Sequence, residues 1–124
     1  MGLSREEQLQ LVERARRGDE RQRERALAAL LEDFRGAAMA VIHRALAAAG
    51  VGREHAEEAW LQAAFKFYSV GLERFAGRAA PRSYFVRMAL NSAIDIVRAQ
   101  SRQAPLDEPA QPDSRRSAEA LLAR

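Results

Sequence analysis

The stretch DERQRERALAALLEDFRGAAMAVIHRALAAAG, residues 19–50, places apolar side chains three and four residues apart, which is the repeat of an amphipathic α-helix. The apolar stripe consists of Leu27, Leu30, Leu31, Phe34, Ala38, Val41, Ile42 and Leu46. Asp19 is a suitable N-cap for this helix, and the triplet Gly50-Val51-Gly52 ends it. We therefore expect one long helix whose stripe forms the centre of the core.

Two further helices are expected on either side of this stretch. Ser4 and Glu7 have the spacing of a capping box, which predicts a first helix that begins there and ends at Gly18. A third helix is expected over residues 53–70 and ends before Gly71, with an apolar face made of Ala56, Ala59, Trp60, Ala63, Ala64 and Phe67.

The last expected helix of the domain follows an irregular segment, residues 72–80. Pro81 suits the first turn of a helix because its φ angle is already helical and its missing N–H has no partner to lose there. The pattern continues to about Arg102, with Phe85 on the packing side and Asn91 on the outer side. The sequence thus predicts an all-α fold, a compact bundle of about four helices over residues 1–102.

The composition of residues 103–124 differs from that of the domain. Residues 103–113 contain three of the four prolines, together with acidic and small residues, so we expect a flexible linker there. Residues 114–124 resume a helical composition, and we expect them to begin a helix that leads to a C-terminal DNA-binding domain missing from this chain.

Several classes of function are disfavoured by the residues present. The chain has no Cys, and His43 and His55 lie on different expected helices, so no metal site is expected. We find no catalytic constellation, and we expect neither an enzyme nor a cofactor. No apolar run approaches the roughly 20 residues needed to span a bilayer, so a cytoplasmic protein without membrane contact is expected.

A basic segment, residues 74–102, is the best candidate for function. It contains six arginines against the single acid Asp95, and three aromatic residues, Phe75, Tyr84 and Phe85, interrupt them. Guanidinium groups bind phosphates and exposed rings stack on unpaired bases, so such a surface suits single-stranded DNA. The alternative reading is a solvated arginine-rich helix in which Phe75 and Phe85 are core residues.

Two motifs in this segment resemble a known family. The sequences RFAGR at 74–78 and YFVRMALNSAIDIVR at 84–98 keep the spacing of a Phe-x-Gly loop and of an Ala-x-Asn-x-Ala-x-Asp-x-x-Arg helix. The chain resembles, over roughly residues 9–102, the second conserved region of bacterial sigma factors, particularly of the extracytoplasmic-function (ECF) class. Residues 62–65, QAAF, are similar to the segment of that family that docks on polymerase.

The resemblance implies a transcription initiation domain that binds core RNA polymerase and recognises and melts the promoter −10 element. Glu58 and Gln62 would face the coiled coil of the polymerase β′ subunit, with Trp60 and Phe65 packed against neighbouring helices. Promoter DNA, chiefly its single-stranded non-template strand, would be bound by Phe75, Arg78, Arg82, Tyr84, Arg87, Asn91 and Arg98. An anti-sigma factor is a further partner that the resemblance allows, and no cofactor is implied.

Two alternatives stay open at this point. The first is a divergent sigma-like module that keeps the helical fold but serves in protein interaction or regulation without promoter melting. The second is a helical DNA-binding protein that acts without polymerase, which is weaker because the sequence offers no pair of helices joined by the tight turn of a recognition motif.

Overall fold

A computed structural model describes residues 2–102, and within that range the chain is helical and has no strand. The long helices are α1 (Arg5–Arg17), α2 (Glu20–Ala48), α3 (Ala56–Lys66) and α5 (Pro81–Arg102). Three short turns complete the order, namely η1 (Arg53–His55), η2 (Phe67–Gly71) and α4 (Leu72–Arg74). The predicted all-α bundle is confirmed. The predicted linker, 103–113, and the predicted helix start, 114–124, lie outside the described residues.

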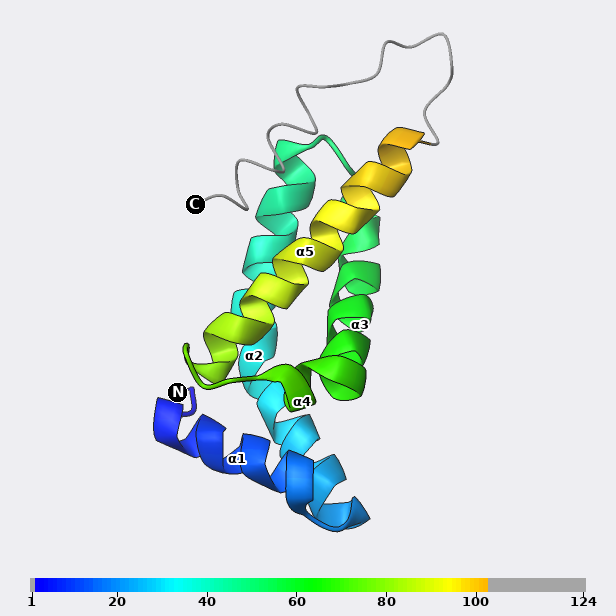
Figure 1. The fold of residues 1–124 in the computed structure, drawn as a ribbon. Helices are drawn as coiled ribbons and strands as arrows, with labels where there is room; N and C mark the ends of the chain where they lie inside the picture. The colour runs from blue at the N-terminus through cyan, green and yellow to red at the C-terminus, as the bar shows by residue number, and fades with distance from the viewer. Residues whose placement is uncertain (1, 103–124) are drawn as a thin grey trace, which may run out of the picture.

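The long helix α2 is the axis on which the others pack (Figure 1). Helices α3 and α5 lie along its C-terminal part, and α5 packs against both α2 and α3. Helix α1 lies across the N-terminal part of α2, beside the loop that joins α4 to α5. This arrangement brings the N-terminal segment and α1 beside the 75–80 loop and the start of α5 at one end of the bundle.

Both N-terminal helices begin at capping boxes. Ser4 Oγ accepts a hydrogen bond from the Glu7 N–H at 3.1 Å, and Glu7 Oε1 accepts one from the Ser4 N–H at 2.9 Å. The bond from the Ser4 backbone lowers the pKa of Glu7 below its usual range, because it stabilises the charged carboxylate. Asp19 and Gln22 make the same reciprocal pair at the start of α2. The predicted starts of both helices are confirmed.

The centre of the core is an aromatic cluster contributed by four segments, α2, α3, η2 and α5. Phe34 of α2, Phe67 of η2 and Phe85 of α5 are each 0% exposed. The Phe85 ring lies 5.3 Å from Phe34, 5.3 Å from Phe67 and 5.4 Å from Trp60, between ring centroids. Offset and edge-to-face packing of this kind adds to the gain from burial itself. Along α2 the buried members of the predicted stripe are Leu30, Phe34, Ala38, Ile42 and Leu46.

The third helix does not end where the sequence predicts. Gly71 stays helical, with φ −61° and ψ −41°, and the chain continues through α4 before the loop begins at Phe75. A Cβ at Gly71 would lie 3.1 Å from Met88 Sδ, so the glycine permits a close approach of α5 and does not break the helix. The irregular segment is therefore 75–80, shorter than the predicted 72–80.

Candidate functional site

The loop of residues 75–80 was expected to present an aromatic ring to solvent at its start, and the structure contradicts this. Phe75 is only 7% exposed. Its ring packs edge-on against Tyr84, with 5.1 Å between ring centroids. The guanidinium of Arg16, a residue of α1, lies 5.8 Å from the centroid of the Phe75 ring. Phe75 is thus a core residue that anchors the loop, and its ring is not available for stacking on a base.

The two rings at the start of α5 also face inward. Phe85 belongs to the central cluster, as the alternative reading allowed. Tyr84 is half-buried, its ring lies 6.5 Å from Phe67, and its hydroxyl donates a hydrogen bond to the Gly71 carbonyl at 3.2 Å. The expectation of arginines interleaved with exposed rings is wrong for this segment, because every ring in it has a packing partner inside the bundle.

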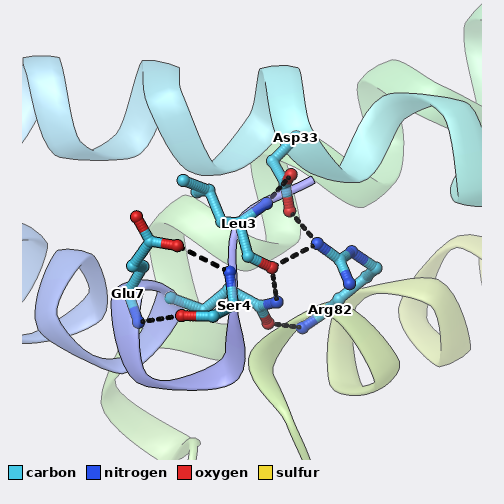
Figure 2. A network of polar contacts seen from close by, with 6 residues as sticks. Leu3, Ser4, Glu7, Asp33 and Arg82 are labelled. Atoms are coloured by element: carbon cyan, nitrogen blue, oxygen red, sulfur yellow. Dashed lines mark hydrogen bonds and ion pairs between the residues drawn. The ribbon is translucent and has the colours of Figure 1, made fainter. Parts of the chain in front are cut away.

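Arg82 is held in a polar network between α1, α2 and α5 (Figure 2). Its Nη2 donates to Asp33 Oδ2 at 2.6 Å and to the Leu3 carbonyl at 2.8 Å. The Asp33 side chain is 7% exposed and also accepts from the Leu3 N–H at 2.7 Å. The structure therefore gives Arg82 a partner that the sequence did not predict: its guanidinium neutralises a buried carboxylate and ties the N-terminal segment to the bundle, while its assignment to DNA stays a prediction.

Three of the predicted DNA-binding residues are exposed. Arg78 lies in the loop, while Arg87 and Asn91 lie four residues apart on α5 and so on one face of that helix. Asp95 continues this face, and its carboxylate pairs with Lys66 Nζ of α3 at 3.3 Å. Arg98 is half-buried. The outer side predicted for α5 is thus confirmed for Arg87, Asn91 and Asp95 but not fully for Arg98, and it carries polar and charged groups without an exposed ring.

The outward face of α3 is more apolar than the sequence indicated. Glu58 is exposed and Gln62 half-buried, at the spacing of four that places both on one face. Beside them Leu61 is 59% exposed and Phe65 68% exposed. The expectation that Phe65 packs against a neighbouring helix is wrong, because Trp60 and Phe67 already fill the inward side. Trp60 is buried as predicted.

This apolar face continues into η2. Tyr68 is 59% exposed and lines a hollow of about 360 Å³ between α1, α2, η2 and α4, together with Ala15, Leu27 and Leu72. We call the exposed residues Leu61, Phe65 and Tyr68 the α3 stripe. The signal for it was present in the sequence: residues 59–68 are apolar on more than one side of the helix, and a single core contact cannot bury every side.

No metal site or membrane span is found in the part of the chain that the structure describes. Residues 2–102 do not bring three His, Asp or Glu side chains together in a way that could hold a metal ion. None of their helices combines the length and apolar content that crossing a membrane requires. Comparison of the chain with protein-family models, with curated proteins and with solved structures finds no match.

Proposed function

We propose that this domain is a transcription initiation module of the sigma region 2 kind, which docks on core RNA polymerase through α3 and contacts promoter DNA through the 75–80 loop and α5. The observation that carries the proposal is the α3 stripe. Leu61 and Phe65 remain largely exposed although the core beneath them is filled, and neighbouring exposed apolar side chains on one helix are typical of a protein-docking surface.

The stripe lies beside the residues that the resemblance assigns to polymerase. Glu58 and Gln62 flank Leu61 and Phe65 on the outward face of α3, so a partner helix laid along α3 would contact polar and apolar groups together. The β′ coiled coil is a partner of this shape. Such a module acts in the cytoplasm, and an anti-sigma factor would act by covering the same face.

The proposed DNA contact relies on charge and on the loop backbone, since the rings are buried. Arg87 and Asn91 offer a guanidinium and an amide on the exposed face of α5, and Arg78 adds a second guanidinium in the loop. These groups suit phosphates and base edges of an opened strand. The small loop residues Ala76, Gly77 and Ala79 leave room for a flipped base beside the loop backbone.

A second function is favoured by a specific observation. Because Phe75 and Phe85 are buried and Arg82 is engaged by Asp33, the surface has fewer groups for capturing a melted strand than the sequence suggested. A sigma-like module that docks on a protein through the α3 stripe without melting DNA fits this reduced surface. The two functions share the docking face and differ in DNA binding, so each face needs its own experiment.

Docking is tested with Phe65→Glu. We expect the affinity of the domain for core RNA polymerase, followed by co-elution, to fall by about tenfold or more, because a carboxylate replaces the most exposed apolar side chain of the stripe. Leu9→Glu is the matched control, since Leu9 is 38% exposed on α1, outside the stripe. Thermal unfolding should change little in either variant. Wild-type affinity for polymerase in Phe65→Glu would contradict docking through α3.

DNA contact is tested with Arg87→Ala. We expect the variant to bind a single-stranded promoter-like oligonucleotide more weakly. The slope of log affinity against log salt should fall in magnitude by about one unit, which corresponds to one lost phosphate contact. Arg25→Ala is the control, because it removes the same charge from an exposed position on α2. An unchanged slope in Arg87→Ala, or equal changes in both variants, would favour the protein-interaction module.

A further inference from the structure

Helix α1 holds the start of the 75–80 loop. Arg16 Nε donates to the Leu72 carbonyl at 2.6 Å, and its Nη2 donates to the Phe75 carbonyl. Leu72 is the first residue of α4 and Phe75 is its C-cap, so both carbonyls belong to the last turn of the helical stretch, where C=O groups have no partner within the helix. The same guanidinium lies 5.8 Å from the Phe75 ring. One arginine from a distant helix therefore fixes both the backbone and the side chain at which the loop begins.

The same helix holds the other end of the loop. Helix α5 begins at Pro81, which has no N–H, and the residue before it is Ala80, whose side chain cannot accept a hydrogen bond. Gln8 supplies what is missing: its Oε1 accepts from the Arg82 N–H at 2.9 Å. Its Nε2 donates to the Leu3 carbonyl at 3.0 Å, and the residue is 1% exposed. Gln8 thus caps α5 from α1.

Between these two ends the loop has little to fix its shape. Residues 76–79 are exposed, and three of them are Ala or Gly, so the loop packs no large side chain of its own. Gly77 has φ 77°, a conformation that disfavours other residues. The one contact across the middle is a long bond of 3.5 Å from Arg5 Nη2 to the Gly77 carbonyl. The conformation of the loop therefore depends on its two anchored ends.

We propose that Arg16 and Gln8 are positioning residues, which hold the 75–80 loop in the conformation that contacts DNA. The DNA part of this inference rests on the proposed function. An anchored loop is already ordered before the ligand binds, so binding costs less conformational entropy. The affinity of the anchored loop is therefore higher than that of a free loop with the same residues. On this basis α1 contributes to DNA binding through the loop, while the α3 stripe is independent of it.

The test uses Arg16→Met and Gln8→Leu, which keep the bulk of each side chain and remove its hydrogen bonds. We expect the hydrogen-bonded backbone N–H groups at the two ends of the loop, those of Phe75, Arg82 and Tyr84, to exchange with solvent about tenfold faster or more, while amides in the core of α2 change much less. Binding of a single-stranded promoter-like oligonucleotide should weaken by about tenfold. Binding of core polymerase should stay at the wild-type level.

Conservative variants separate positioning from a general loss of structure. Gln8→Glu still accepts from the Arg82 N–H but no longer donates to the Leu3 carbonyl, so it should restore slow exchange of the Arg82 N–H in part. Arg16→Lys can reach one carbonyl but not both, so it should restore slow exchange in part. Arg17→Met is the matched control, because Arg17 is 82% exposed and pairs only with Glu13 on the same helix. It should leave the exchange of the loop and the binding of the oligonucleotide unchanged.

The outcomes for the two proposals can be told apart. If the backbone N–H groups at the ends of the loop exchange at the wild-type rate in both Arg16→Met and Gln8→Leu, the positioning role is overturned, whatever the oligonucleotide result. Faster exchange that is equal in the loop and in the core of α2 also overturns it, because the variant would then have lost stability as a whole. Faster loop exchange in a domain whose wild-type form does not bind the oligonucleotide supports positioning by α1 and overturns the DNA contact instead.

Discussion

Phe34→Ala is expected to cost about 3–5 kcal/mol of unfolding free energy, the range for a large ring removed from a core. Phe34 is 0% exposed and its ring packs 5.3 Å from Phe85 and 6.0 Å from Phe67. The change therefore opens a cavity where α2, η2 and α5 meet. A loss of this size is a large part of the roughly 5–15 kcal/mol that stabilises a typical domain. Urea or thermal unfolding followed by circular dichroism measures it.

Phe65→Ala is the matched control for this prediction. It removes the same atoms from a side chain that is 68% exposed, so the free energy of unfolding should change by no more than about 0.5 kcal/mol. The pair of variants thus separates a phenylalanine that stabilises the fold from one that is free to bind a partner. Equal losses in the two variants would contradict both the packing of Phe34 and the exposure of the α3 stripe.

The local signals in the sequence predicted most of the fold. The capping pairs at Ser4 and Asp19 act within one turn of a helix, so the helix starts they predict do not depend on distant contacts. Pro81 likewise marks the start of α5 from its own fixed φ, although the cap of that helix comes from Gln8. The predicted end of the third helix was wrong because it does involve a distant contact. Gly71 was taken as a helix end, yet it stays helical, and its missing Cβ leaves room for Met88 of the helix packed across it.

The candidate site was harder to predict because its residues are decided by partners far along the chain. Phe75 packs inside between Tyr84 and Arg16, and Arg16, which also bonds to the Phe75 carbonyl, lies 59 residues earlier. Likewise Arg82 pairs with Asp33, 49 residues earlier. No motif within the segment 74–102 carries this information. Of the seven predicted DNA-binding residues, Arg78, Arg87 and Asn91 are the exposed ones.

Arg82→Met is expected to destabilise the domain by about 3 kcal/mol, because it leaves the carboxylate of Asp33 buried without its cation. The figure is at the low end for a buried pair, since the Arg82 side chain is 34% exposed while that of Asp33 is 7% exposed. The remaining partner of the carboxylate would be the Leu3 N–H. Urea unfolding of the variant at neutral pH measures the loss.

A double-mutant cycle distinguishes this ion pair from the phosphate contact that the sequence suggested. Adding Asp33→Ala to Arg82→Met should restore part of the lost stability, with a coupling energy of about 1–3 kcal/mol, because no charge is then left buried and unpaired. Losses that simply add would show that the two side chains do not depend on each other. If Arg82→Met instead kept full stability and lowered the salt slope of oligonucleotide binding, Arg82 would be a phosphate contact and its place in the network of Figure 2 would be incidental.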